Sequence, residues 1–147
     1  MKVVIAIDGS KFSKEALQWY LKNVHKTDNK VILVHVTDHL HNFAYNTSII
    51  PGDPELIQLA YQEEEHKAKA IMDEMNDFIS KNQVDGEVVR VFGHPGHQIV
   101  KKAHDVEADL VLTGSRGLGT IRRTVLGSVS DYVIHHSNVP VIVCQHQ

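Results

Sequence analysis

Short apolar runs alternate along the chain with longer segments in which apolar residues recur at helical spacing. Five runs predict β-strands, at residues 2–8, 31–36, 87–92, 110–112 and 139–144. The segments after the first four runs place apolar residues three or four positions apart, which predicts helices. Strands that alternate with helices in this way are typical of an α/β fold, with a parallel sheet and helices on both of its faces.

The order of the strands is partly indicated by their polarity. The run at 2–8 is apolar on both faces, which is typical of a central strand in a parallel sheet. The run at 87–92 contains a polar residue and is expected nearer an edge. Pro140 has no N–H to donate, so the last run also fits an edge strand.

Helix starts and charged surfaces are predicted from local composition. Ser10 or Ser13 can cap the first helix. Asp53 followed by Pro54 is a typical start for the next helix. The acidic run at 63–65 is expected to be a solvated face of that helix.

The stretch from Asp109 to Asp131 holds four of the nine glycines of the chain. An apolar strand leads into a glycine-rich loop, and helical spacing begins after Gly127–Ser128. Glycines let backbone N–H groups approach an oxyanion, and a helix start offers unpaired N–H groups and partial positive charge. The stretch therefore predicts a phosphate site. The alternative is a long loop that needs glycines for its turns and binds nothing.

The spacing Gly114-x2-Gly117-x9-Gly127-Ser128 resembles the ATP-binding signature of the universal stress protein family. Further resemblances are VVIAIDGS at 3–10, LVHV at 33–36, GHP at 93–95 and NVPVIVC at 138–144. Together they cover essentially the whole chain. The resemblance implies one domain over residues 1–147, with a Rossmann-like open sheet of five parallel strands in the order 3-2-1-4-5.

The resemblance also implies an ATP site, with Mg²⁺ accompanying the nucleotide. The binding residues that it implies are Asp8, Val36, Thr113, Gly114, Gly117, Gly127, Ser128 and Val129. The chemistry of the spacer adds Arg122 and Arg123 as candidates. In the family, the positions of Asp8, Val36 and Thr113 lie near the adenosine. The glycines and the helix start surround ribose and phosphates. Thr113 stands where many relatives carry a methionine.

Three of these residues have an ordinary structural alternative. Asp8 can serve as a cap for the helix that follows it. Arg122 and Arg123 can be solvated loop residues, or one of them can pair with the terminal phosphate. The residues alone leave these alternatives open.

The chain has eleven histidines, and four of them follow predicted strands. His39 and His41 follow the second strand, while His94 and His97 follow the third. If these loops converged, four imidazoles would hold zinc or a similar metal. No closely spaced Cys/His signature supports this, so we expect surface histidines and no metal.

Composition narrows the classes of function. A chain of 147 residues with 42% apolar residues is long enough to bury a proper core. The net charge of −3 gives no electrostatic case for nucleic acid. We see no run long enough to span a membrane, and the single cysteine, Cys144, fits a reducing cytoplasm. The chain lacks a P-loop motif and the dinucleotide-binding G-x-G-x-x-G in its first turn, which makes both classes of site unlikely.

We therefore expect an ATP-binding stress-response regulator or nucleotide sensor with little or no hydrolysis. It would act in the cytoplasm, as a homodimer paired through the strand Val139–Cys144, with a protein partner still to be identified. The alternative is a dimeric interaction module of the same family that binds no nucleotide. No Ser–His–Asp or Cys–His spacing supports a hydrolase.

Overall fold

A computed structural model describes residues 1–39, 53–115 and 126–145 of the chain. Its centre is a five-stranded, fully parallel sheet of order β3-β2-β1-β4-β5. This confirms the predicted fold class and strand order. The strands are β1 (Lys2–Ala6), β2 (Lys30–Thr37), β3 (Gly86–Phe92), β4 (Leu110–Gly114) and β5 (Val141–Cys144).

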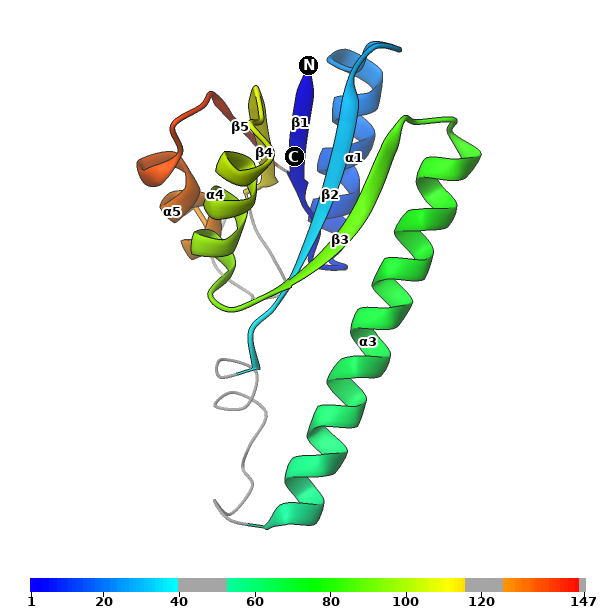
Figure 1. Cartoon of the computed structure of the whole chain (residues 1–147), viewed down its shortest axis with the longest axis vertical. Helices are drawn as coiled ribbons and strands as arrows, with labels where there is room; N and C mark the ends of the chain where they lie inside the picture. Colours follow the sequence, from blue (N-terminus) through cyan, green and yellow to red (C-terminus); the bar gives the residue numbers. More distant parts are fainter. Residues whose placement is uncertain (40–52, 116–125, 146–147) are drawn as a thin grey trace.

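Helices cover both faces of the sheet (Figure 1). They are α1 (Lys11–Asn23), α3 (Pro54–Lys81), α4 (Pro95–Asp105) and α5 (Ser128–His136). α1 and α3 pack on one face, where Ile5, Leu17 and Met75 are fully or almost fully buried. α4 and α5 pack on the other, around Val4, Ile99 and Val133. The two cores explain why the central strands are apolar on both sides.

The edge strands are the two that the sequence indicated, β3 and β5. β5 begins at Val141, two residues later than predicted, because Pro140 lacks an N–H and contributes only its carbonyl, which accepts from the Val111 N–H at 3.0 Å. The helix starts are also confirmed. Ser10 caps α1, and Asp53 caps α3 with Pro54 in its first turn.

The expectation that 63–65 is merely a solvated face is wrong for two of its three residues. Glu63 is exposed, but Glu65 receives a two-pronged hydrogen bond from Arg90 on β3, at 2.7 Å for each contact. Glu64 lies 2.6 Å from Nδ1 of His39. The acidic run therefore joins α3 to the ends of β2 and β3.

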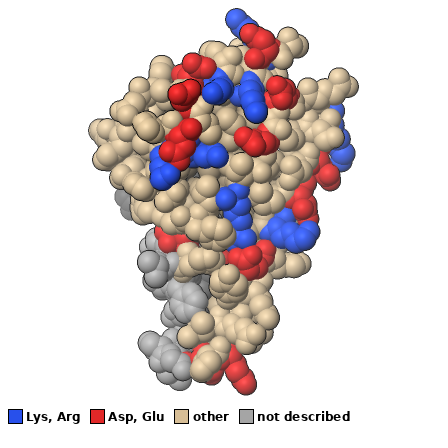
Figure 2. Space-filling view, in the orientation of Figure 1, with Lys and Arg blue, Asp and Glu red and all other residues tan. Residues whose placement is uncertain are grey.

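Charged side chains are intermixed over the face seen in Figure 2, with acidic residues beside basic ones. Among the described residues, some charged side chains form pairs one helical turn apart, such as Lys69 with Asp73 and Lys101 with Asp105. Within the described ranges, the structure has no helix that is both long enough and apolar enough to cross a bilayer.

Candidate functional site

The strand order places the end of β1 next to the end of β4 at the carboxyl edge of the sheet. β1 pairs with β4 in parallel, with Val3 opposite Leu110 and Ile5 opposite Leu112. β1 is followed by α1, and β4 is followed along the chain by α5. The order of the strands reverses between β1 and β4, which is where open α/β sheets bind ligands.

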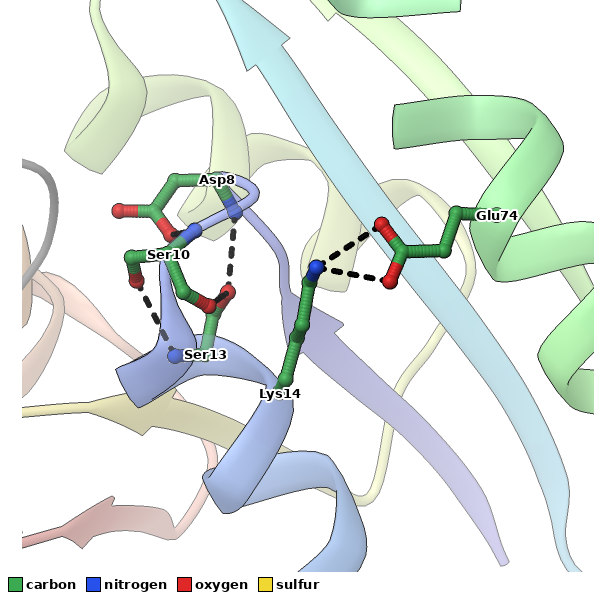
Figure 3. A network of polar contacts seen from close by, with 5 residues as sticks. All are labelled: Asp8, Ser10, Ser13, Lys14 and Glu74. Atoms are coloured by element: carbon green, nitrogen blue, oxygen red, sulfur yellow. Dashed lines mark hydrogen bonds and ion pairs between the residues drawn. The ribbon is translucent and has the colours of Figure 1, made fainter. Parts of the chain in front are cut away.

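The first turn, between β1 and α1, is held by its own polar groups (Figure 3). Oδ1 of Asp8 accepts a hydrogen bond from the Ser10 N–H at 2.9 Å. Oγ of Ser10 accepts from the Ser13 N–H at 3.2 Å and so caps α1. The cap is thus Ser10, and Asp8 positions it. The other carboxylate oxygen of Asp8 points away from the labelled residues in Figure 3.

Gly9 allows this turn to be tight. Its φ is +83°, a conformation that favours glycine. A Cβ at this position would lie 2.7 Å from Cδ1 of Ile71 on α3. Lys14 and Glu74 add an ion pair of 2.7 Å between α1 and α3 (Figure 3).

Backbone hydrogen bonds connect the described residues that flank the second turn, between β4 and α5. The Ser115 N–H donates to the Cys144 carbonyl at 2.8 Å, and the Gly127 N–H donates to the Ser115 carbonyl at 2.8 Å. These bonds bring the start of α5 to the end of β4. Gly127 is the N-cap of α5 and has no side chain, so the N-cap residue itself satisfies none of the first N–H groups of that helix.

A buried hydroxyl lies at the end of β4. Thr113 is 2% exposed, and its Oγ1 is the one buried side-chain oxygen or nitrogen in the described part of the chain without a hydrogen-bond partner. Alternation along β4 puts Thr113 on the same face as Val111, toward α4 and α5. The missing partner is a feature that the sequence alone does not reveal.

Seven of the ten predicted binding residues fall within the described ranges. Asp8 and Val36 follow or end β1 and β2, Thr113 and Gly114 end β4, and Gly127, Ser128 and Val129 begin α5. All seven belong to strand ends or helix starts at the carboxyl edge of the sheet. Gly117, Arg122 and Arg123 lie outside the described residues.

His35 is a buried residue beside the first turn that sequence reasoning missed. Its Nδ1 lies 2.9 Å from the Ile7 carbonyl, so Nδ1 carries the proton and donates it. Burial lowers the pKa of His35, although the Ile7 carbonyl and the charge of Asp8 act in the opposite direction. The signal in the sequence that could have indicated this residue is a histidine inside a strand that is otherwise apolar.

Arg90 was also missed, and it links β3 to its neighbours. Its Nε donates to Oγ1 of Thr37 at 2.8 Å, and its two terminal nitrogens bind Glu65. The Arg90 guanidinium lowers the pKa of Glu65 by this hydrogen bonding. These contacts connect α3 to the sheet and involve no residue of the two turns.

The four histidines considered as metal ligands do not all meet. His39 stacks on Tyr61 of α3, whereas the ring of His94 lies 5.6 Å from that of Tyr132 on α5. These two histidines therefore face opposite sides of the sheet. His41 lies outside the described residues. Among the residues that are described, no group of three or more His, Cys, Asp or Glu could hold a metal ion.

A cavity in the described part of the molecule lies away from this site. Its volume is about 520 Å³, and it is lined by the end of α4, including His104, and by the turns before β4 and β5, including Glu107 and Asn138. Those turns are at the amino edge of the sheet. Ligands of open parallel sheets bind at the carboxyl edge, so this cavity is not the candidate site.

Comparison with known proteins agrees with the fold and with the sequence motifs. The profile of the universal stress protein family matches residues 1–145. The chain belongs to the universal stress protein family. Universal stress protein Sll1388 of Synechocystis sp. is 28% identical to it, over 99% of this chain and 97% of its own.

Solved structures are also similar to this chain in sequence and in fold. The hypothetical protein MJ0577 is 26% identical, with a TM-score of 0.82 over 99% of this chain and 96% of its own. A universal stress protein whose crystal structure is a complex with cAMP is 25% identical, with a TM-score of 0.70 over 100% of this chain and 98% of its own.

Proposed function

We propose that this universal stress protein binds ATP at the carboxyl edge of its sheet and acts, as a single domain, as a nucleotide-dependent regulator. The observation that carries the proposal is the start of α5. Gly127 supplies no capping side chain there, so the N-cap residue occupies none of the N–H groups of the first turn, and these groups can donate to an anion. The glycine spacing before it, and the relative that binds cAMP, support a nucleotide as the anion.

We expect the two turns to bind different parts of the nucleotide. The phosphates lie at the positive end of α5, near Gly127, Ser128 and Val129. The nucleoside lies toward β1 and β2, where Asp8 has a carboxylate oxygen directed away from its own turn and Val36 is half-buried. We expect Mg²⁺ to be held mainly by phosphate oxygens, the ligands it prefers.

The proposed role is binding with little or no turnover. Phosphoryl transfer needs a group that orients the attacking water, and the sequence from Gly114 to Ser130 contains no Asp, Glu, Gln or His. Bound nucleotide would act by changing the surface offered to a protein partner in the cytoplasm. Phosphate release with Mg²⁺ and excess ATP should therefore be far slower than the roughly 1–100 s⁻¹ of kinases.

Calorimetric titration with ATP, AMP and GTP tests the binding site. Wild type should bind the adenine nucleotides, and Gly127→Val should bind them at least tenfold more weakly because a branched side chain blocks approach to the backbone. The φ of Gly127 is −64°, so the substitution leaves the backbone unstrained. Equal affinity in both proteins would reject this site. Absence of binding by wild type would favour the interaction module that binds no nucleotide.

We further propose a homodimer paired through β5. Carbonyls of Pro140 and Cys144 face β4, so alternation turns the backbone groups of Val141 and Val143 toward the open edge. An apolar edge of this kind invites pairing with a second copy about a two-fold axis. Light scattering should give a dimer for wild type and a monomer for Val143→Pro, which removes one outward N–H. A wild-type monomer at high concentration would reject the interface.

A further inference from the structure

The buried, unpaired hydroxyl of Thr113 is expected to lower the stability of the folded protein. Hydroxyl groups withdrawn from water are nearly always hydrogen-bonded, because an unpaired one costs free energy in the folded state. Thr113 is 2% exposed, and Oγ1 has no partner among the described residues. By contrast, Thr37 is equally buried, and its Oγ1 accepts a hydrogen bond from Arg90 at 2.8 Å.

The position of Thr113 links this hydroxyl to the candidate site. It is the residue before the last of β4, and Ile5 pairs with Leu112, so Ala6 of β1 is its neighbour in the sheet. Ala6 and Gly114 are only half-buried, so Thr113 lies just below the open strand ends. Val129, in the first turn of α5, packs on the same face of the sheet.

We propose that the Thr113 hydroxyl is a specificity-determining group that forms its hydrogen bond with the nucleoside part of the bound nucleotide. This inference rests on the proposed function. The surroundings favour an uncharged partner, because Val111, Ala6 and Val129 on this face are apolar. A phosphate is better placed at the uncapped start of α5. The ligand atom is therefore a ribose hydroxyl or a polar atom of the base.

The proposal predicts opposite effects on stability and on binding for one substitution. Thr113→Val replaces the hydroxyl by a methyl of nearly the same shape. In the protein without nucleotide it removes an unpaired polar group, so the melting temperature should rise by about 2–4 °C. In the complex it removes a hydrogen bond, so the dissociation constant should rise about tenfold.

Matched variants separate the effect of losing the Thr113 hydroxyl from the general effect of replacing a buried threonine. Thr37→Val leaves the Arg90 Nε without its acceptor, so it should lower the melting temperature and leave nucleotide affinity unchanged. Thr113→Ser keeps the hydroxyl and should bind nucleotide within about threefold of wild type, a much smaller change than loss of the hydrogen bond. The same variants are titrated with adenosine, AMP and ATP.

The nucleoside contact is supported if Thr113→Val weakens all three ligands by the same factor. A loss confined to AMP and ATP would overturn it and assign the hydroxyl to phosphate. Wild-type affinity in Thr113→Val, or a melting temperature that falls, would also overturn it. If wild type itself binds none of the three ligands, the proposed function fails, and the melting temperature of the variant still shows whether the hydroxyl is unpaired.

Discussion

β1 and β4 are neighbours in the sheet, yet the described polar groups that follow these two strands are bonded differently. After β1, Asp8, Ser10 and Ser13 bond to one another, and a side chain caps α1. After β4, the cap of α5 is a glycine, and the hydroxyl of Thr113 has no partner among the described residues. The polar groups after β1 are bonded within the protein, whereas at the end of β4 and the start of α5 the described residues provide no acceptor on the N-cap and no partner for the Thr113 hydroxyl.

This difference suggests that the first turn serves mainly stability and the second mainly binding. Groups that are satisfied internally stabilise the free protein, whereas unsatisfied groups reduce its stability and can be compensated by a ligand. Substitutions in the two turns should therefore fall into separate classes. The following predictions test that separation, beginning with the largest effect.

Gly9→Ala should lower the free energy of unfolding by about 1–3 kcal/mol, because alanine is strained at positive φ. Its Cβ would also press against Ile71 of α3. Urea unfolding followed by circular dichroism measures the loss. Gly127→Ala is the matched control, with a φ of −64°, and should cost no more than about 1 kcal/mol. Equal losses at the two glycines would contradict the comparison.

Gly127→Asp should give α5 a side-chain cap, as Ser10 gives α1. A carboxylate at the N-cap accepts from the first N–H groups of α5, so stability should rise by roughly 0.3–1 kcal/mol. The same carboxylate repels phosphate, and ATP affinity should fall at least tenfold, which is about 1.4 kcal/mol. Gly127→Asn caps without the charge and should bind ATP better than the aspartate variant. If the aspartate variant binds ATP as tightly as wild type, the phosphates do not bind at this turn.

His35 should make the first turn sensitive to acid. Burial lowers the pKa of His35 below the ordinary value of 6.5, so the unfolded chain takes up its proton first as the pH falls. The stabilising contribution is complete above pH 6.5 and is lost as the pH falls toward the lowered pKa of the folded protein. The slope from one proton cannot exceed about 1.4 kcal/mol per pH unit.

His35→Asn keeps a donor for the Ile7 carbonyl and cannot titrate. Urea midpoints of both proteins between neutral and mildly acidic pH should therefore converge as the pH falls. Parallel curves would show that other groups, such as the acidic residues paired with Arg90 and His39, carry the whole dependence.

The ion pair between Lys14 and Glu74 should contribute least. Its side chains are 35% and 51% exposed, and such surface pairs contribute at most about 1 kcal/mol. A double-mutant cycle with Lys14→Ala and Glu74→Ala should give a coupling that shrinks further at high salt. A coupling that is large and independent of salt would mean that this pair, rather than Gly9 and Ser10, holds the first turn.

Much of the fold could be predicted from sequence because its signals are local. Apolar runs defined the strands, and Ser10 and Asp53 were recognisable caps. The adjacency of β1 and β4 came from the family resemblance, since no local pattern encodes which parallel strands pair. Polar contacts between distant elements were missed for the same reason. Nothing near Glu65 indicates that Arg90 lies opposite it, 25 residues away.

The candidate site was predictable in composition but not in its state of hydrogen bonding. The glycine spacing and the family resemblance indicated ten residues, and the seven of them that are described lie at the carboxyl edge. That Ser10 rather than Asp8 caps α1 depends on the exact course of the turn. That the Thr113 hydroxyl has no partner depends on all the groups packed around it. Such features follow from three-dimensional packing and become visible only in a structure.

The length of α3 has a consequence for how the molecule opens. Its 28 residues extend about 42 Å, whereas the seven residues of β3 extend only about 23 Å. The helix therefore projects beyond the sheet (Figure 1), and Leu59 near its start is 60% exposed while Met75 farther along is buried. Amide protons in the first turns should exchange with solvent through local fraying, and those near Met75 only when the core itself opens. A single helix thus joins a segment of low local stability to one that reports on global unfolding.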